Sequence, residues 1–413
     1  MEEQATMAAE AEEVSATPQT EQTATGGEPP KKKTFFGAVW AFAKKNAMML
    51  IAMLAAVITM FFEPPSAEYA KYFDVSQLRT LTCLFCTLAV ICALKNVRFF
   101  YILARKIVQV FKTARISVRA LVYITFIGSM LLAYDMALIT FLPLGFLVLT
   151  TTKKEKYMAF TFIMQNIAAN LGGMLTPFGN PQNLFLYNNF NIPTGEFMAI
   201  MAPPFVLSVT LITIACLIFV KPEPLELPDE QVKLPVARTV IYLILFAFAI
   251  ALILIRDIPF PIWIALAAIV PIAILIMDGK ALLDVDYPLL LTFVSFFVFA
   301  GNMGKIEAVG NLMKPLMETN TLLFSTLSCQ FISNVPSATL LAQFTANYPD
   351  LLVGVNIGGV GTLIASLASL ITFREYTKNN PGKTKYYVGL FSAFNFAFLF
   401  ILLGFMLLWG IWF

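Results

Sequence analysis

The sequence predicts an all-α polytopic membrane protein, arranged as an inverted-topology repeat with two re-entrant hairpins and two broken transmembrane helices. Apolar runs of about 18 or more residues recur in a chain that is 59% hydrophobic and only 13% charged, and such runs match the ~30 Å hydrocarbon layer. Two of these runs carry glycine and polar residues at their centres. The pattern around these interruptions recurs in both halves of the chain.

The apolar runs also predict how the chain is threaded. Most of the 28 Lys and Arg fall on the side that holds the N-terminus, so the positive-inside rule predicts a cytoplasmic N-terminus. Nine crossings then leave the C-terminus outside, and we expect a multi-pass protein of the plasma membrane. The predicted crossings are 45–62, 75–95, 157–190, 195–220, 238–255, 258–277, 287–303, 351–373 and 386–412.

Composition divides the chain into four parts. Residues 1–34 predict a disordered cytoplasmic tail that is rich in Glu, Ala and Thr. A first repeat (35–220) holds a hairpin at 120–152 and a broken helix at 157–190. A linker with one connecting span (221–257) precedes a second repeat (258–413), which holds a hairpin at 321–349 and a broken helix at 351–373. The connecting span makes the second repeat enter the membrane from the opposite side.

The hairpins are predicted from length. Between Arg119 and Lys153, both assigned to the cytoplasm, lie 33 residues. About 16 residues per limb reach only ~24 Å, which is too short to cross and return. The tips are expected at 133–135 and 333–339.

A short alignment supports the repeat. The segment "NLGGMLTPFGNPQNL" from Asn170 matches "NIGGVGTLIASLASL" from Asn356 at Asn, two Gly, Thr and Leu. Each segment follows a predicted hairpin and precedes a final long span.

Several chemistries are excluded or disfavoured. The chain has no histidine, which removes histidine-based metal sites, triads and general bases. Cys83-x-x-Cys86 fits two small apolar residues on one helix face better than a redox or metal pair. We expect no cofactor, no metal beyond a transported or coupling alkali cation, and no nucleic-acid partner, because no basic cluster belongs to a soluble domain.

The broken spans predict a binding site. Glycines and prolines between Gly172 and Pro181 interrupt helical hydrogen bonding, which the membrane tolerates where the freed backbone groups line a cavity inside the protein. Free carbonyls suit a cation and free N–H groups suit an anion. The alternative is a helix that is kinked for packing. The first break adds Asn170, Thr176, Gly179, Asn180 and Asn183, and the second adds Asn356, Gly358, Thr362 and Ser366.

The hairpin tips differ in charge. Asp135 is the only charged residue between Arg119 and Lys153 and is expected to bind the coupling cation or carry a proton. The alternative is a helix cap. The second tip offers the uncharged residues Ser333, Asn334, Ser337 and Thr339, whose hydroxyls can instead bond carbonyls of their own helix.

At these motifs the chain resembles the ion transporter superfamily, in the branch of arsenite permeases, D-type sodium/proton antiporters and citrate-type permeases, which is related to sodium/dicarboxylate symporters. The similar segments are "ANLGGMLTPFGNPQNLF" (169–185), "SNVPSATLL" (333–341) and "YDMALITFLPL" (134–144). Tyr134 stands where the family has Asn, and the first tip lacks the Ser-Asn-Thr signature of dicarboxylate symporters.

The resemblance implies a homodimer in which hairpins and broken spans slide as an elevator. It implies one cation site at Asp135, Asn170 and Gly172 and another at Asn334, Ser337, Asn356 and Gly358. Substrate is then expected at Thr176, Gly179, Asn180, Asn183, Ser333, Thr339, Thr362 and Ser366.

We weigh three functions against these sequence features. The first is a secondary active transporter of a small inorganic or organic anion, coupled to Na⁺ or H⁺. The second is a cation transporter, namely a Na⁺/H⁺ antiporter, with arsenite or antimonite efflux as a related possibility. A membrane-embedded enzyme is disfavoured, because the chain lacks histidine and paired intramembrane carboxylates.

Overall fold

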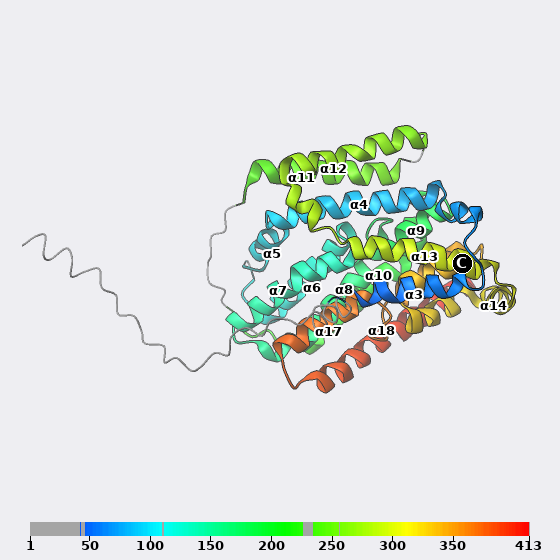
Figure 1. The fold of residues 1–413 in the computed structure, drawn as a ribbon. Helices are drawn as coiled ribbons and strands as arrows, with labels where there is room; N and C mark the ends of the chain where they lie inside the picture. Colours follow the sequence, from blue (N-terminus) through cyan, green and yellow to red (C-terminus); the bar gives the residue numbers. More distant parts are fainter. Residues whose placement is uncertain (1–41, 43–45, 110, 226–233, 256, 413) are drawn as a thin grey trace, which may run out of the picture. The chain divides into compact units, whose positions relative to one another are not determined.

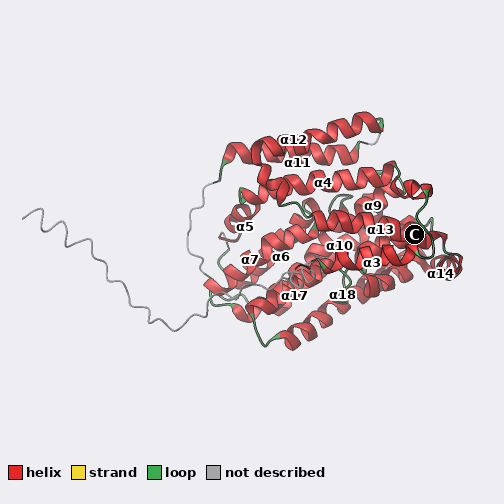
Figure 2. Cartoon of the chain, viewed as in Figure 1, coloured by secondary structure: helices red, strands yellow, loops and turns green. Residues whose placement is uncertain are grey.

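The computed structural model describes residues 42, 46–109, 111–225, 234–255 and 257–412. Within this part of the chain the regular secondary structure is helical (Figure 2), and an isolated bridge joins Thr113 to Pro224. The predicted disordered tail and the middle of the predicted linker, 226–233, lie outside the described residues.

The helices follow one another along the chain as coloured in Figure 1. They are α3 (Ala47–Met60), η1 (Ala67–Phe73), α4 (Val75–Asn96), α5 (Phe99–Gln109), α6 (Ala114–Leu131), α7 (Tyr134–Thr151), η2 (Glu155–Tyr157), α8 (Met158–Gly172), η3 (Gly173–Leu175), α9 (Pro181–Asn189), α10 (Thr194–Phe219), α11 (Val236–Leu254), α12 (Phe260–Leu283), α13 (Tyr287–Lys305), α14 (Glu307–Ile332), α15 (Asn334–Leu341), α16 (Tyr348–Ile357), α17 (Leu367–Asn379) and α18 (Thr384–Trp412).

Contacts divide the chain into two compact units, Met1–Ala47 and Met48–Phe413. In the first, the Asn46 side chain donates to the Phe42 carbonyl at 3.2 Å. The second unit contains the helices that carry the candidate site.

Eight of the described helices are long and apolar enough to cross a membrane: α4, α6, α7, α10, α11, α12, α13 and α18. The predicted all-helical, multi-span class is therefore confirmed. α3 is apolar but has only 14 residues. The two broken spans are absent from the eight because each is divided into shorter helices, α8 with α9 and α16 with α17.

The predicted hairpins correspond to helix pairs whose bounds differ from the expectation. α6 and α7 have 18 residues each, because α6 begins at Ala114 and takes Arg115 and Arg119 into the helix. Each is about 27 Å long, more than the sequence estimate for one limb. In the second pair, Asn320 has non-helical angles inside α14 (φ −164°, ψ 92°), directly before the predicted start of the hairpin at residue 321.

The packing of these helices follows a crossed pattern. The first helix of each pair packs on the first part of the following broken span, so α6 contacts α8 and α14 contacts α16. The second helix packs on the end of the other broken span, so α7 contacts α17 and α15 contacts α9. α11 and α12 both pack on α4 (Figure 1).

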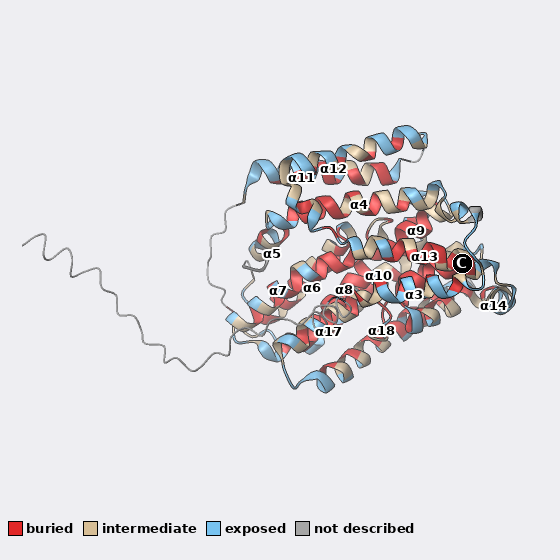
Figure 3. Cartoon of the chain, in the orientation of Figure 1, coloured by how far each residue is buried: buried red, intermediate tan, exposed pale blue. Residues whose placement is uncertain are grey.

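Burial separates the centre of this unit from its lipid-facing surface. Every residue of α8 and of α15 is buried. α11 and α12 instead expose large apolar side chains on their outer faces, among them Ile244, Leu275 and Ile276 (Figure 3). Such a surface is expected to face lipid tails rather than water.

Candidate functional site

One asparagine, Asn183, hydrogen-bonds the backbone carbonyls in the break of the first broken span. α8 ends at Gly172, Thr176 is extended (φ −110°, ψ 146°), and α9 begins at Pro181. The Asn183 side-chain nitrogen donates to the carbonyls of Gly173, Met174 and Thr176 at 3.1, 3.2 and 3.3 Å. Where a helix is broken inside a membrane, such carbonyls lose their partners within the helix. Here the side chain of Asn183, from the start of α9, satisfies them.

A glutamine holds the second broken span. Gln330 donates through Nε2 to Gly358 O at 2.8 Å and to Val360 O at 3.3 Å, and its Oε1 accepts from Thr362 N at 2.9 Å. Gly361 has φ +135°, and a side chain there would run into the Gln330 amide. The break then ends at Ser366, whose hydroxyl caps α17 by accepting from Ala368 N at 3.1 Å.

Each break is also tied to the helix pair before it. The Thr176 hydroxyl donates to Met130 O at 2.7 Å, just before the first tip. The Thr362 hydroxyl donates to Gln330 O at 3.0 Å, just before the second. At the second tip, Asn334 N donates to Ala365 O at 2.9 Å. Thr176 and Thr362 are aligned in the internal repeat, and their hydroxyls make corresponding bonds.

Four asparagines, which we term the asparagine network (Asn170, Asn180, Asn183 and Asn356), join the two breaks. Asn180 Nδ2 donates to Asn356 Oδ1 at 3.3 Å, and Asn356 Nδ2 donates to Asn183 Oδ1 at 2.6 Å. Asn180 Nδ2 also lies 3.4 Å from Asn170 O. All four side chains are at most 2% exposed, so segments 170 to 190 residues apart share one buried polar centre.

Some polar atoms of this centre have no hydrogen-bond partner in the part of the chain that the structure describes. They include Asn170 Oδ1, Asn180 Oδ1 and Asn334 Nδ2. A Cβ at Gly359 would lie 3.0 Å from Asn334 Nδ2 and 3.2 Å from Asn170 Oδ1, so glycine allows these groups to approach the backbone. Buried polar groups are normally paired, and unpaired oxygens and an amide donor leave capacity for a ligand.

Asp135 makes no hydrogen bond to this network. Its side chain is 6% exposed, and neither carboxyl oxygen has a hydrogen-bond partner among the described residues. It is in the first turn of α7 but does not act as the cap that the sequence left as the alternative, because it accepts no backbone N–H. The three residues of the first predicted cation site, Asp135, Asn170 and Gly172, are not joined by hydrogen bonds, and their common role stays a prediction.

Gly172 and Gly358 allow neighbouring helices to pack closely in this structure. A Cβ at Gly358 would lie 2.7 Å from Gly354 O and 2.9 Å from Cys329 Sγ. A Cβ at Gly172 would lie 2.5 Å from Ser129 Oγ. Gly358 thereby lets α16 approach α14, and Gly172 lets α8 approach α6. These contacts are of the kind that the packing alternative expects, and the part of Gly172 and Gly358 in cation binding stays a prediction.

The remaining predicted residues differ in their partners. Ser337 Oγ lies 2.9 Å from Ser328 Oγ across the second pair, and Ser333 Oγ donates to Ala365 O at 3.3 Å. Thr339 bonds the carbonyls of Val335 and Pro336 in its own helix, which is the alternative stated for the hydroxyls. Gly179 packs against Gly173, where a Cβ would lie 2.9 Å from Cα.

Sequence reasoning missed several buried amides that support this centre. Gln330 clamps the second break, Gln165 Nε2 donates to Thr125 Oγ1 at 3.0 Å, and Asn166 Nδ2 donates to Asn395 Oδ1 at 3.4 Å. Asn395 is an amide in a long apolar helix. A search for polar residues inside apolar runs would have found it, since such residues seldom face lipid.

A charged cluster lies at the ends of these helices. Glu223 accepts from Lys154 at 2.9 Å, from Lys156 at 2.5 Å and from the Tyr157 hydroxyl at 2.9 Å. The hydrogen bonds from Lys156, Lys154 and Tyr157 lower the pKa of Glu223 to about 2. Ala114 N donates to Glu223 O at 2.7 Å, so the segment after α10 is fastened to the start of α6 and to the loop after α7.

Comparison with known proteins gives a consistent result. A family model described as citrate transporter matches residues 37–351. An uncharacterized transporter of Methanocaldococcus jannaschii is 32% identical over 305 residues, which cover 74% of this chain and 82% of that protein. The inner membrane protein YbiR of Escherichia coli is 28% identical over 285 residues, which cover 67% of this chain and 74% of that protein.

Proposed function

Because this chain belongs to the citrate transporter family, we propose that it is a secondary active transporter that moves a small anion, a carboxylate or oxyanion, coupled to Na⁺ or H⁺. Transport then follows an elevator-type alternating-access mechanism. The observation that carries the proposal is the buried centre where two helix breaks meet through the Asn180–Asn356 and Asn356–Asn183 hydrogen bonds.

The paired contacts support an inverted-topology repeat. Thr176 and Thr362 bond the backbone before the two tips in the same way, and the second helix of each pair packs on the opposite broken span. Two broken helices at one midplane site are typical of transporters with inverted repeats. In this proposal the helix pairs α6–α7 and α14–α15 move together with α8, α9, α16 and α17, while α4, α11, α12 and α13 stay fixed.

Asp135 is proposed as the coupling residue. A buried carboxylate without a partner is costly in its charged form, and a bound cation or proton removes most of that penalty. The unpaired oxygens of Asn170 and Asn180 are neutral ligands in the same helical unit. A second, uncharged cation site is proposed at Asn334, Ser337, Asn356 and Gly358.

The substrate position is proposed between the tips and the breaks, with Thr176, Asn180, Asn183, Ser333, Thr362 and Ser366 as its polar surround. The protein is proposed to act as a homodimer in the plasma membrane, with a cytoplasmic N-terminus. No catalytic step is assigned.

The test is transport by purified full-length protein in proteoliposomes. Radiolabelled citrate, succinate or sulfate should accumulate when a Na⁺ or pH gradient is imposed. Accumulation should stop when the same gradient is dissipated by an ionophore, and Asp135→Asn should abolish gradient-driven uptake. Accumulation of none of the three anions under either gradient would argue against the proposal.

Asp135 also favours a second candidate, a Na⁺/H⁺ antiporter, because one buried carboxylate can exchange a proton for Na⁺. That function predicts proton release from proteoliposomes on Na⁺ addition with no anion present. Arsenite efflux is a further variant of the same scaffold, and it predicts arsenite movement without a Na⁺ requirement.

A further inference from the structure

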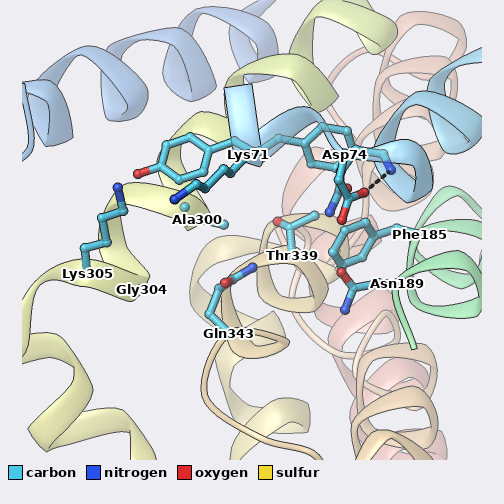
Figure 4. A pocket seen from close by; sticks show the side chains of 13 residues that line it. Lys71, Asp74, Phe185, Asn189, Ala300, Gly304, Lys305, Thr339 and Gln343 are labelled. Carbon is cyan, nitrogen blue, oxygen red and sulfur yellow. Dashed lines mark hydrogen bonds between the residues drawn. The ribbon is translucent and has the colours of Figure 1, made fainter. Parts of the chain in front are cut away.

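A cavity of about 350 Å³ lies away from the asparagine network, between helices of the two proposed groups. Its wall comes from η1, α4 and α13 on one side and from α9, α15 and the residues after α15 on the other (Figure 4). A volume of this size is at the lower end of those that hold small organic ligands.

The charged side chains give this cavity a positive character. Lys71 from η1 and Lys305 from α13 both line it (Figure 4). Lys305 Nζ lies 5.1 Å from the centre of the Tyr72 ring. Tyr72 also lines the cavity, and its hydroxyl has no hydrogen-bond partner within the described ranges. The one carboxylate of the wall, Asp74, is engaged in capping α4, where it accepts from Ser76 N at 2.7 Å and Gln77 N at 3.2 Å.

The rest of the wall combines a small-residue face with an aromatic one. A Cβ at Gly301 would lie 2.6 Å from the Tyr72 ring, and a Cβ at Gly304 would lie 3.4 Å from Gln343. These glycines let α13 come close to η1 and to Gln343. The ring centres of Phe185 and Phe297 lie 5.6 Å apart with the rings tilted by 31°, and the two rings form an apolar wall. Two ammonium groups, amide donors and an apolar wall are what a small carboxylate with a hydrocarbon backbone requires.

We propose that this cavity is an anion-binding site for a soluble organic carboxylate bearing at least two negative charges, in which Lys71 and Lys305 supply the charge and Gln343 a hydrogen-bond donor. The inference rests on the proposed function and deepens it, because the site spans the boundary between the proposed moving and fixed groups. The positive-inside assignment puts both lysines on the outer side. The site therefore receives the anion before it reaches the centre.

The positive charge of this cavity also discriminates between charged and uncharged substrates. Two lysines attract a di- or tricarboxylate at neutral pH, whereas arsenous acid is uncharged there and gains little from them. The site therefore favours the anion transporter over the arsenite variant.

The test uses the reactivity of one engineered thiol. The chain has five cysteines, and all of them are buried, whereas Gln343 is exposed at the cavity. Gln343→Cys in the full chain should react faster with an anionic methanethiosulfonate than with a cationic one. Lys71→Gln together with Lys305→Gln should lower this rate ratio about tenfold, because each ammonium attracts one reagent and repels the other.

Citrate should protect this thiol, and the double glutamine variant should lose the protection. Lys71→Arg with Lys305→Arg keeps the charge and should retain both effects. Lys314→Gln is the matched control, since Lys314 is exposed on α14 and does not line the cavity. Three results would each refute the proposed anion site. They are an unchanged rate ratio in the double glutamine variant, an equal fall of the rate ratio with Lys314→Gln, and no protection of the thiol by citrate or succinate.

Two further experiments separate a lipid ligand from a soluble anion, and a failure of the anion site from a failure of the proposed function. If phosphatidylglycerol in nanodiscs protects the thiol and citrate does not, the ligand is a lipid headgroup and the proposal fails. Asp135→Asn should stop coupled uptake and leave citrate protection intact. Protection without any transport would refute the proposed function while the anion site stands, and transport without protection would refute only the site.

Discussion

The hydrogen bond between Asn356 and Asn183 is predicted to couple the two broken spans energetically. It is 2.6 Å long, and its two side chains are 1% and 0% exposed. Interhelical hydrogen bonds in membrane proteins contribute ~0.6 kcal/mol on average and ~1.7 kcal/mol at most. A short, fully buried bond belongs near the upper limit, so we expect a coupling free energy of about 1.5 kcal/mol.

The single substitutions have larger effects than the coupling. Asn183→Ala leaves the carbonyls of Gly173, Met174 and Thr176 without this donor. An unpaired buried carbonyl costs about 1 kcal/mol or more, which gives a loss of about 3 kcal/mol in unfolding free energy. Asn356→Ala leaves Asn183 Oδ1 unpaired and removes one acceptor of Asn180, so we expect about 2 kcal/mol.

The assay is a double-mutant cycle on reversible unfolding in detergent micelles, with Asn183→Ala, Asn356→Ala, the pair and the parent chain. A matched cycle combines Asn183→Ala with Asn379→Ala. Among the described residues, the Asn379 side chain bonds only to Glu375 of its own helix, so it should show no coupling. A coupling for the Asn183–Asn356 pair that is no larger than the ~0.3–0.5 kcal/mol seen between independent sites would refute the idea that this bond joins the spans.

Three further outcomes follow from the same contacts. Gln330→Leu should lower the melting temperature more than Gln343→Leu, because Gln330 bonds two carbonyls and one N–H of the second break whereas Gln343 is exposed. Equal shifts would contradict the role of Gln330 in stabilising the second break. Glu223→Gln should lower the melting temperature at pH 7. The difference in melting temperature from the parent protein should disappear as the pH falls from about 4.5 to about 2, because a carboxylate with a lowered pKa stabilises the fold only while it is ionised. A difference that does not change with pH would contradict an ionised Glu223 that stabilises the fold. Gly359→Ala should reduce transport more than Gly310→Ala, measured as initial uptake, because a Cβ meets Asn334 and Asn170 only at position 359.

The sequence was most informative where the membrane limits what a backbone can do. The glycines and prolines from Gly172 to Pro181 disfavour a continuous apolar helix, so the end of α8 at Gly172 and the start of α9 at Pro181 were predictable. The second break carries no proline, and only its similarity to the first identified it. The helical class and the citrate transporter relationship followed from the same segments.

The partners of the site residues were less predictable, because they depend on contacts distant in sequence. Nothing local indicated that Asn183 bonds three carbonyls or that Asn356 reaches the first break. Arg119 was taken as a membrane boundary, yet α6 begins five residues earlier, at Ala114; Arg115 within it donates to Val220 O at 2.7 Å. A paired arginine can lie inside a helix near its end, and its charge alone does not mark the boundary.

The two breaks share a frame but differ in the charge placed beside it. Thr176 and Thr362 make matched bonds to the backbone before each tip, which any interrupted helix at this depth needs. The residue two positions after Ala133 is the buried Asp135, whereas the residue two positions after Ser333 is Val335. The backbone hydrogen bonds that shape the two breaks therefore correspond, whereas a carboxylate at the start of the second helix of the pair occurs only in the first half, at Asp135. If Asp135 is the coupling group, Val335→Asp should alter the ion dependence of transport, and Asp135→Asn should remove it.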